Sequence, residues 1–107
     1  MTELAGLQPL PRKPSAIILD HNWWGFIYNP CGVQIRHLIG VDKILWSSDF
    51  PHHHGDWPRS VAIVEEQFAG VDEEEKFQIV RGNALERYGI ETDGPKTYQE
   101  EVAATRR

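Results

Sequence analysis

One carboxylate and a run of histidines stand together in the middle of the chain, in the stretch LWSSDFPHHHGDWP at residues 45–58. Asp49 closely follows an apolar run, and after it come Phe50, a proline and then His52, His53 and His54. Carboxylates and imidazoles bind divalent metals and transfer protons in catalysis. An aspartate before a proline-containing turn is also a frequent side-chain cap. The stretch therefore has two interpretations, the rim of a metal-dependent active site or a polar loop, and we favour the first.

A complete metal site is not expected from this stretch alone, because consecutive histidines project in different directions and rarely all reach one ion. Catalytic zinc usually has three protein ligands and one open position. Besides Asp49, the candidate ligands in the chain are His21, His52, His53, His54 and Cys31. Trp57 has two interpretations as well: it walls a pocket for a planar substrate together with Phe50, or it packs in the core or against the loop.

The composition limits the class of protein. With 107 residues, 40% of them hydrophobic, the chain is expected to form a single domain. A net charge of -5 with scattered basic residues argues against a nucleic-acid partner. The single cysteine, Cys31, excludes an internal disulfide and a thiolate-rich zinc cluster. No secretory signal is recognised, and no run approaches the roughly 18 apolar residues of a membrane span. We therefore expect a cytoplasmic protein with no membrane partner.

The elements that must position Asp49 follow from apolar patterns and from glycine, proline and cap signals. We predict strands at residues 22–28 and 41–46, with a short helix at residues 31–39 between them. Two more helices are expected, one that Ser60 caps and Gly70 stops, and one that Asp72 and Glu75 open and Gly89 ends. Gly82 and Asn83 predict either a kink in the last helix or a restart of the helix that Asn83 caps. Residues 15–21 fit either a strand or a final helical turn.

Residues 1–14 are expected to be extended, and residues 91–107 to form a flexible polar tail. A helical crossover between two apolar strands predicts that the strands are parallel, and parallel strands must be covered on both faces. Two strands cannot achieve this alone. The order strand, helix, strand, helix, helix in residues 15–90 therefore predicts part of a larger α/β architecture.

Two separate motifs resemble one known family. ILWSSDFPHHHGDWPRS, followed by EEEKFQIVRGNALERYGI, is similar to the C-terminal end of the amidohydrolase-related family, and the phrases KPS, NP-x-G and LIGVD also match. That family contains metal-dependent TIM-barrel hydrolases and decarboxylases, including the aminocarboxymuconate-semialdehyde decarboxylase type. The resemblance implies that residues 15–90 are a C-terminal fragment of a (β/α)8 TIM barrel, with Ile44 through His52 in the region of the eighth strand.

The resemblance also implies roles for particular residues. Asp49 matches the aspartate that approaches the metal and helps to activate its bound water, so it is the expected catalytic residue and metal ligand. His52 matches an orienting or substrate-side histidine, and we assign Trp57 to the substrate side as well. The cofactor implied is a divalent metal, zinc first and manganese as the alternative. The segments that carry the family's other ligands have no counterpart here, so we expect metal binding by this chain alone to be weak or absent.

The leading hypothesis is therefore a C-terminal segment of a metal-dependent hydrolase or decarboxylase that acts on a small substrate, for example an aromatic or carboxylated one. The alternative is a noncatalytic module that binds a partner through exposed strand edges, either the remainder of the barrel or a second copy of the chain. A third hypothesis is a small histidine-based metal carrier.

Overall fold

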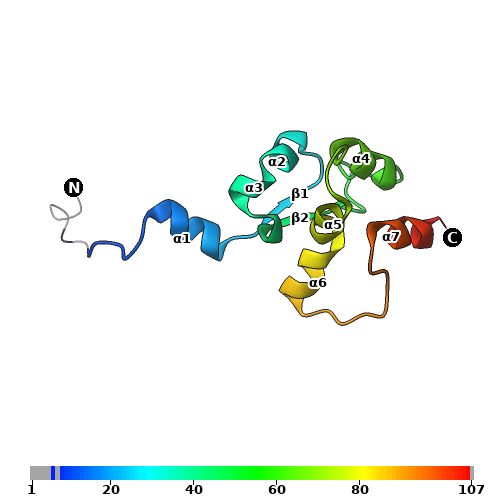
Figure 1. The fold of residues 1–107 in the computed structure, drawn as a ribbon. Coiled ribbons are helices and arrows are strands. Elements are labelled where there is room, and N and C mark those ends of the chain that lie inside the picture. Colours follow the sequence, from blue (N-terminus) through cyan, green and yellow to red (C-terminus); the bar gives the residue numbers. More distant parts are fainter. Residues whose placement is uncertain (1–5, 7, 107) are drawn as a thin grey trace.

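The computed structural model describes Gly6 and residues 8–106, and Figure 1 shows most of them as helices gathered around a small sheet, with α1 projecting to one side. The elements in chain order are α1 (Pro14–His21), β1 (Trp24–Phe26), α2 (Pro30–Gln34), α3 (Arg36–Ile39), a 3-10 turn (Val41–Lys43), β2 (Ile44–Trp46), α4 (Ser60–Gln67), α5 (Glu73–Phe77), a π-helical turn (Gln78–Gly82), α6 (Asn83–Tyr88) and α7 (Tyr98–Thr105). Within the described residues, no helix combines the length and the apolar character that a membrane span requires.

The two strands pair in parallel, as their helical connection predicts. The register joins Trp24 to Ile44 and Phe26 to Trp46, and α2 and α3 form the crossover between the strands. Both strands are shorter than predicted. Residues 41–43 turn into a 3-10 helix after Gly40, whose φ of 109° lies in a region that glycine adopts easily. This arrangement is a small parallel sheet within a partial α/β fold.

The helices pack on one face of this sheet. The buried core consists of Val33, Ile44, Val64, Phe68, Ile79 and Tyr98, and Phe26 and Trp46 pack against it. Because side chains alternate along a strand, Gly25 and Leu45 belong to the opposite face. Neither residue is part of the described core, and Leu45 is partly buried, so the core lies on one side of the strands.

The segment from α5 to α6 follows the predicted signals closely. Asp72 caps α5 by accepting hydrogen bonds from the backbone N–H groups of Glu74 and Glu75. A π-helical turn precedes Asn83, where we predicted a kink, and Gly89 ends α6 in the left-handed conformation with φ 62°. One signal was misread: Ser60 is the first residue of α4 and does not cap it, because its hydroxyl donates to Asp56 instead.

Glu75 links α5 to α3 and does not complete a reciprocal capping box with Asp72. One carboxylate oxygen accepts a hydrogen bond from Arg36 Nε at 2.7 Å, and the other lies 2.6 Å from His37 Nε2. These contacts, with His37 first and Arg36 second, hold the pKa of Glu75 below its ordinary value of 4.5. The stabilisation from Glu75 is therefore present above its unfolded pKa and is lost as the pH falls through the lowered folded pKa.

We expect Glu75→Gln to lower the free energy of unfolding at neutral pH by up to about 1 kcal/mol, because the pair is partly exposed. Urea unfolding at neutral pH and in acid should show the difference from wild type disappearing as the wild-type carboxylate is protonated. Glu74→Gln, in the exposed neighbour, is the control and should change little. A difference that stays constant into acid would show that the lowered pKa of Glu75 does not contribute to stability.

The C-terminal segment corrects one prediction. Residues 91–107 were expected to be a tail without regular structure, but Tyr98–Thr105 form α7. Thr97 caps this helix by accepting a hydrogen bond from the backbone N–H of Glu100, and Tyr98 is only 5% exposed. Burial raises the pKa of the Tyr98 hydroxyl to about 12. Tyr98 and Val102, one helical turn apart, both pack in the core, and two apolar residues were too weak a periodicity to predict this helix.

Two cationic side chains stack on Trp23, which follows the C-terminal end of α1, and connect this end of the helix to the rest of the fold. Lys43 Nζ lies 3.9 Å and Arg87 Cζ 4.3 Å from the centre of the Trp23 ring system. Lys43 Nζ also donates a hydrogen bond to the backbone oxygen of Asp20, at 3.1 Å. Residues 15–21, which the sequence left undecided, are therefore a helix fixed at its C-terminal end, while none of the residues of α1 is buried.

Candidate functional site

Asp49 lies just beyond the C-terminal end of β2, which ends at Trp46. Its backbone has φ 54°, the left-handed conformation that aspartate adopts more readily than most residues other than glycine. Its side chain is 49% exposed. Carboxyl ends of parallel strands are where barrel enzymes carry their catalytic groups. Asp49 therefore has the position that the active-site interpretation requires, on an open surface.

His52 is the nearest functional side chain to Asp49. Its Nδ1 lies 3.3 Å from Asp49 Oδ2, and its backbone N–H donates to the backbone oxygen of Asp49 at 2.8 Å. The imidazole is 53% exposed. The turn thus brings together an oxygen donor and a nitrogen donor, the two ligand types that zinc and manganese sites use.

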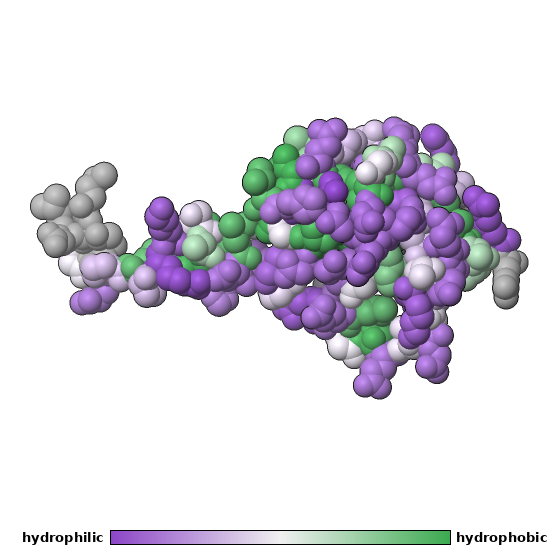
Figure 2. Space-filling model, viewed as in Figure 1, coloured by the Kyte–Doolittle hydropathy of each residue, from purple (hydrophilic) through white to green (hydrophobic). Residues whose placement is uncertain are grey.

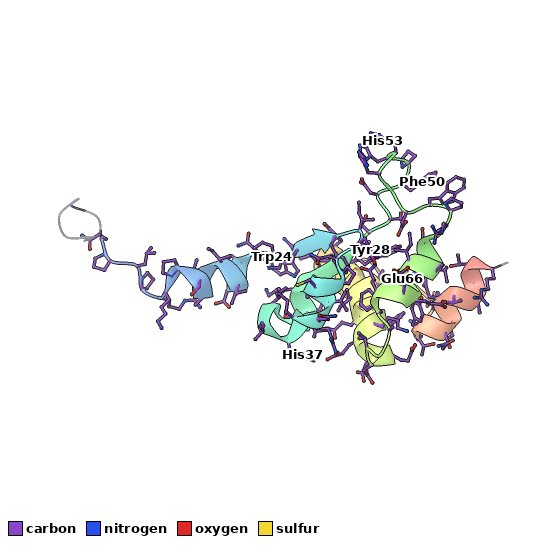
Figure 3. All side chains as sticks on the ribbon, turned by 90° about the horizontal axis from the view of Figure 1, so that it is seen from above. Trp24, Tyr28, His37, Phe50, His53 and Glu66 are labelled. Carbon is purple, nitrogen blue, oxygen red and sulfur yellow. The ribbon has the colours of Figure 1, made fainter. Side chains whose placement is uncertain are left out.

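His53 and His54 stack with His52 at the outer end of the same loop, and Figure 3 shows His53 at the tip, away from the helices. The ring centroids lie 4.4 Å apart for His52 and His53, and 4.1 Å apart for His53 and His54. The three rings are thus closer together than the sequence suggested. Even so, in the part of the chain that the structure describes, no group of three or more histidine, cysteine or carboxylate side chains is arranged to hold a metal ion.

Trp57 contacts Phe50 across the loop. The two rings meet edge to face, with centroids 5.6 Å apart, and they are 67% and 62% exposed. Trp57 is therefore outside the core and beside the turn that carries Asp49. The other candidate ligands, His21 at the end of α1 and Cys31 in α2, are exposed on elements that precede the loop.

The base of the loop contains residues that the sequence analysis did not identify. Asp56 is 7% exposed, its backbone N–H donates to the backbone oxygen of Ser48 at 3.2 Å, and its Oδ1 accepts from Ser60 Oγ at 2.6 Å. The available signal was the spacing of an aspartate four residues before a serine at a helix start. Asp56 and Ser60 therefore join the end of β2 to the start of α4.

A cavity of about 220 Å³ lies beside this base, between β2, α4 and α7. Its lining includes Trp46, Ser48, Ser60 and Tyr98, together with valine side chains. Asp49 does not line it. Its half-exposed carboxylate is thus outside this cavity.

Gly55 makes the loop compact, because a Cβ atom at this position would lie 2.7 Å from the Ser48 backbone oxygen and 2.9 Å from that of His52. We expect Gly55→Ala to lower the free energy of unfolding by about 1–3 kcal/mol, as overpacking against fixed backbone does. NMR chemical-shift changes should concentrate in residues 47–57. Gly25→Ala is the matched control, because its Cβ would meet only the Leu45 backbone oxygen, at 4.0 Å. Equal changes in the free energy of unfolding for the two variants would show that the loop backbone moves to make room for the added methyl group.

A comparison with protein-family models gives a match. A family model described as amidohydrolase matches residues 3–90, most of the 107-residue chain and the whole region that contains both strands and the loop. A comparison with curated proteins finds no match. The matched region runs to the end of α6, so it contains the elements that position Asp49 and His52. The chain therefore belongs to the amidohydrolase family.

Proposed function

We propose that this chain supplies the last two strands of a (β/α)8 barrel and the catalytic aspartate of a metal-dependent hydrolase or decarboxylase that acts on a small aromatic or carboxylated substrate. The observation that carries the proposal is the location of Asp49, in a left-handed turn at the C-terminal end of a parallel strand, with an imidazole beside its carboxylate. In this proposal β1 and β2 are neighbouring barrel strands, and the helices on one side form the outer layer.

The sheet face opposite the core supports a larger assembly. Parallel strands are normally covered on both faces, whereas Gly25 and Leu45 lie on the face opposite the described core. In a closed barrel this face points into the barrel interior, and the outer edges of β1 and β2 pair with further strands. Phe50 and Trp57 then stand at the mouth of the barrel, where Trp57 contacts the substrate side.

The residues fit a divalent metal in kind but not in number. Members of the amidohydrolase family usually bind divalent metals, and Asp49 with His52 presents one oxygen and one nitrogen donor. Among the described residues, no third donor joins them in an arrangement that could hold an ion. Zinc is the metal we propose first and manganese second, with the other ligands coming from the rest of the barrel. When bound, the metal acts as a Lewis acid and makes water more acidic.

The chain's own contribution is to hold a carboxylate where a proton must be accepted. The Asp49 carboxyl group is half-exposed, and a carboxylate within hydrogen-bond reach of reacting water serves as a general base. His52 Nδ1 accepts the His54 backbone N–H at 3.4 Å and lies 3.3 Å from Asp49 Oδ2, so the loop keeps an imidazole nitrogen beside this carboxylate. Hydrolysis and decarboxylation can use the same aspartate, since the two reactions differ in residues that contact the substrate.

A second candidate function is a noncatalytic module that binds a protein partner. It is favoured by exposed apolar side chains outside the loop, including Leu38 at 78% and Ile35 at 43% exposure on and between α2 and α3. Figure 2 shows apolar surface over this part of the body, close to where α1 projects. The partner would be the remainder of a barrel or a second copy of the chain, held at the open edges of β1 and β2.

Calorimetric titration of the pure 107-residue chain with zinc and with manganese, together with turnover assays on small carboxylated and aromatic substrates, tests the proposal. We expect weak binding and no turnover, because one carboxylate and one adjacent imidazole do not complete a site. Stoichiometric sub-micromolar binding with turnover would show that the chain is a complete enzyme. Light scattering tests the second candidate, since association through the open strand edges should give a dimer or a larger species and a stable monomer would contradict it.

A further inference from the structure

The backbone of Asp49 is fixed on both sides of its α-carbon. The Ser48 carbonyl and the Asp49 N–H belong to one planar peptide unit. Asp56 N–H donates to the oxygen of this unit, at 3.2 Å, and the Asp49 N–H of the same unit donates to Ser47 Oγ, also at 3.2 Å. On the other side, His52 N–H donates to the Asp49 carbonyl at 2.8 Å. The left-handed φ of Asp49 thus depends on peptide planes that neighbouring groups hold in place.

Asp56 is in turn held by its own side chain. Its Oδ1 accepts the Ser60 hydroxyl at 2.6 Å, and Ser60 is the first residue of α4. We call this pair the Asp56–Ser60 clasp. The clasp therefore connects the loop to the core, because α4 contributes Val64 to the core.

Stability alone does not account for a carboxylate at this position. Asp56 is 7% exposed, and its Oδ2 is a buried atom without a hydrogen-bond partner in the described structure. Burying a charged oxygen without a partner costs free energy, whereas an apolar side chain of similar shape would avoid that cost. What the side chain does provide is one short hydrogen bond to Ser60, and through it a fixed Asp56 N–H beneath the peptide that orients Asp49.

We propose that Asp56 is a positioning residue for Asp49, which acts through Ser60 and the Ser48 carbonyl and does not touch the reacting groups. The inference rests on the proposed function in one respect, namely that Asp49 is the reacting carboxylate. The geometry predicts that an acceptor oxygen at position 56 is required and that its negative charge is not.

NMR of the full chain tests whether position 56 needs an acceptor oxygen or a negative charge. A residue with positive φ gives a strong NOE between its own amide proton and Hα, and we expect this signal at Asp49 in wild type and in Asp56→Asn, which keeps an acceptor for Ser60. Asp56→Ala and Ser60→Ala should weaken it. Ser60→Ala removes a single oxygen atom, so this variant should stay folded. The methyl signals of Val64 and Ile79 report whether the core is intact. Ser15→Ala, in α1, is the matched control and should leave the NOE unchanged.

Manganese broadening of the Ser48 and His52 amide signals provides a second readout. If Asp56 positions Asp49, Asp56→Asn should keep the metal response that Asp56→Ala weakens. Wild type and Asp56→Asn should broaden at similar manganese concentrations, and Asp56→Ala should need about 10-fold more metal, the lower end of the effect of outer-shell partners. The proposal is overturned if Asp56→Ala and Ser60→Ala keep the Asp49 NOE, or if Asp56→Asn loses it. If the NOE behaves as expected but Asp49→Asn broadens at the same manganese concentrations as wild type, Asp49 does not bind the metal, so the proposed function fails and the clasp stands.

Discussion

Replacing Asn83 by alanine is expected to lower the free energy of unfolding by about 2–4 kcal/mol, because a buried carbonyl left without its donor costs about 1–3 kcal/mol and a second, part-buried carbonyl loses its donor as well. Asn83 is 2% exposed, and its Nδ2 donates to the backbone oxygens of Val41 and Ile44 at 2.6 and 2.7 Å. These oxygens belong to the start of the 3-10 turn and the start of β2. A helix side chain thus holds the strand that leads to Asp49.

Urea unfolding of Asn83→Ala measures this effect, and Asn22→Ala is its matched control. Asn22 also donates to a backbone oxygen, that of Ile18 at 2.7 Å, but it is exposed, so the control should change stability little. Asn83→Asp should be more damaging than alanine at neutral pH, since a carboxylate would face two carbonyl oxygens, and it should recover partly in acid when the carboxyl can donate one proton. Equal stabilities of wild type and Asn83→Ala would show that the two carbonyls find other donors.

Replacing Asp49 by asparagine is expected to remove the chain's response to divalent metal. The change keeps the shape of the side chain but removes the negative charge beside His52. Since outer-shell partners alone alter metal affinity by about 10- to 100-fold, loss of a charged ligand should reach at least the upper end of that range. Manganese-dependent broadening of the amide signals of residues 48–52 provides the measurement, because it detects weak binding in the full chain.

Two further variants make the Asp49 result specific. Asp42→Asn, an exposed aspartate before β2, removes the same charge away from the loop and should leave the broadening intact. His53→Ala with His54→Ala removes the outer imidazoles but keeps the contact between Asp49 and His52. Broadening that survives Asp49→Asn and disappears in the double histidine variant would favour the histidine-based metal carrier over the barrel enzyme.

The short-range features of the fold were predictable because local rules determine them. The Asp72 cap, the irregular turn before Asn83 and the left-handed Gly89 all follow from the conformational preferences of single residues. The parallel pairing of the strands was predictable from the helical connection between them. The position of Asp49 after the strand could likewise be predicted, since the apolar run ILW ends shortly before it.

Other features depended on contacts between residues far apart in the chain. Tyr98 and Val102 make α7 part of the core by packing against side chains that are distant in the sequence, and Lys76 Nζ lies 4.5 Å from the centre of the Tyr98 ring. The segment itself is too polar to reveal this. Glu75 pairs with Arg36 and His37 on α3, 38 or 39 residues earlier, where local rules suggested a reciprocal cap.

By itself, the sequence determined the family, the parallel strand pair and the carboxylate with histidines at its end, because motifs and periodicity are properties of neighbouring residues. Only the tertiary structure decided that Asn83 holds the start of β2, and that Asp56 and Ser60 close the loop beneath Asp49. The physical reason is that a buried polar group must find its partner wherever the packed chain brings one, and sequence spacing does not encode that distance.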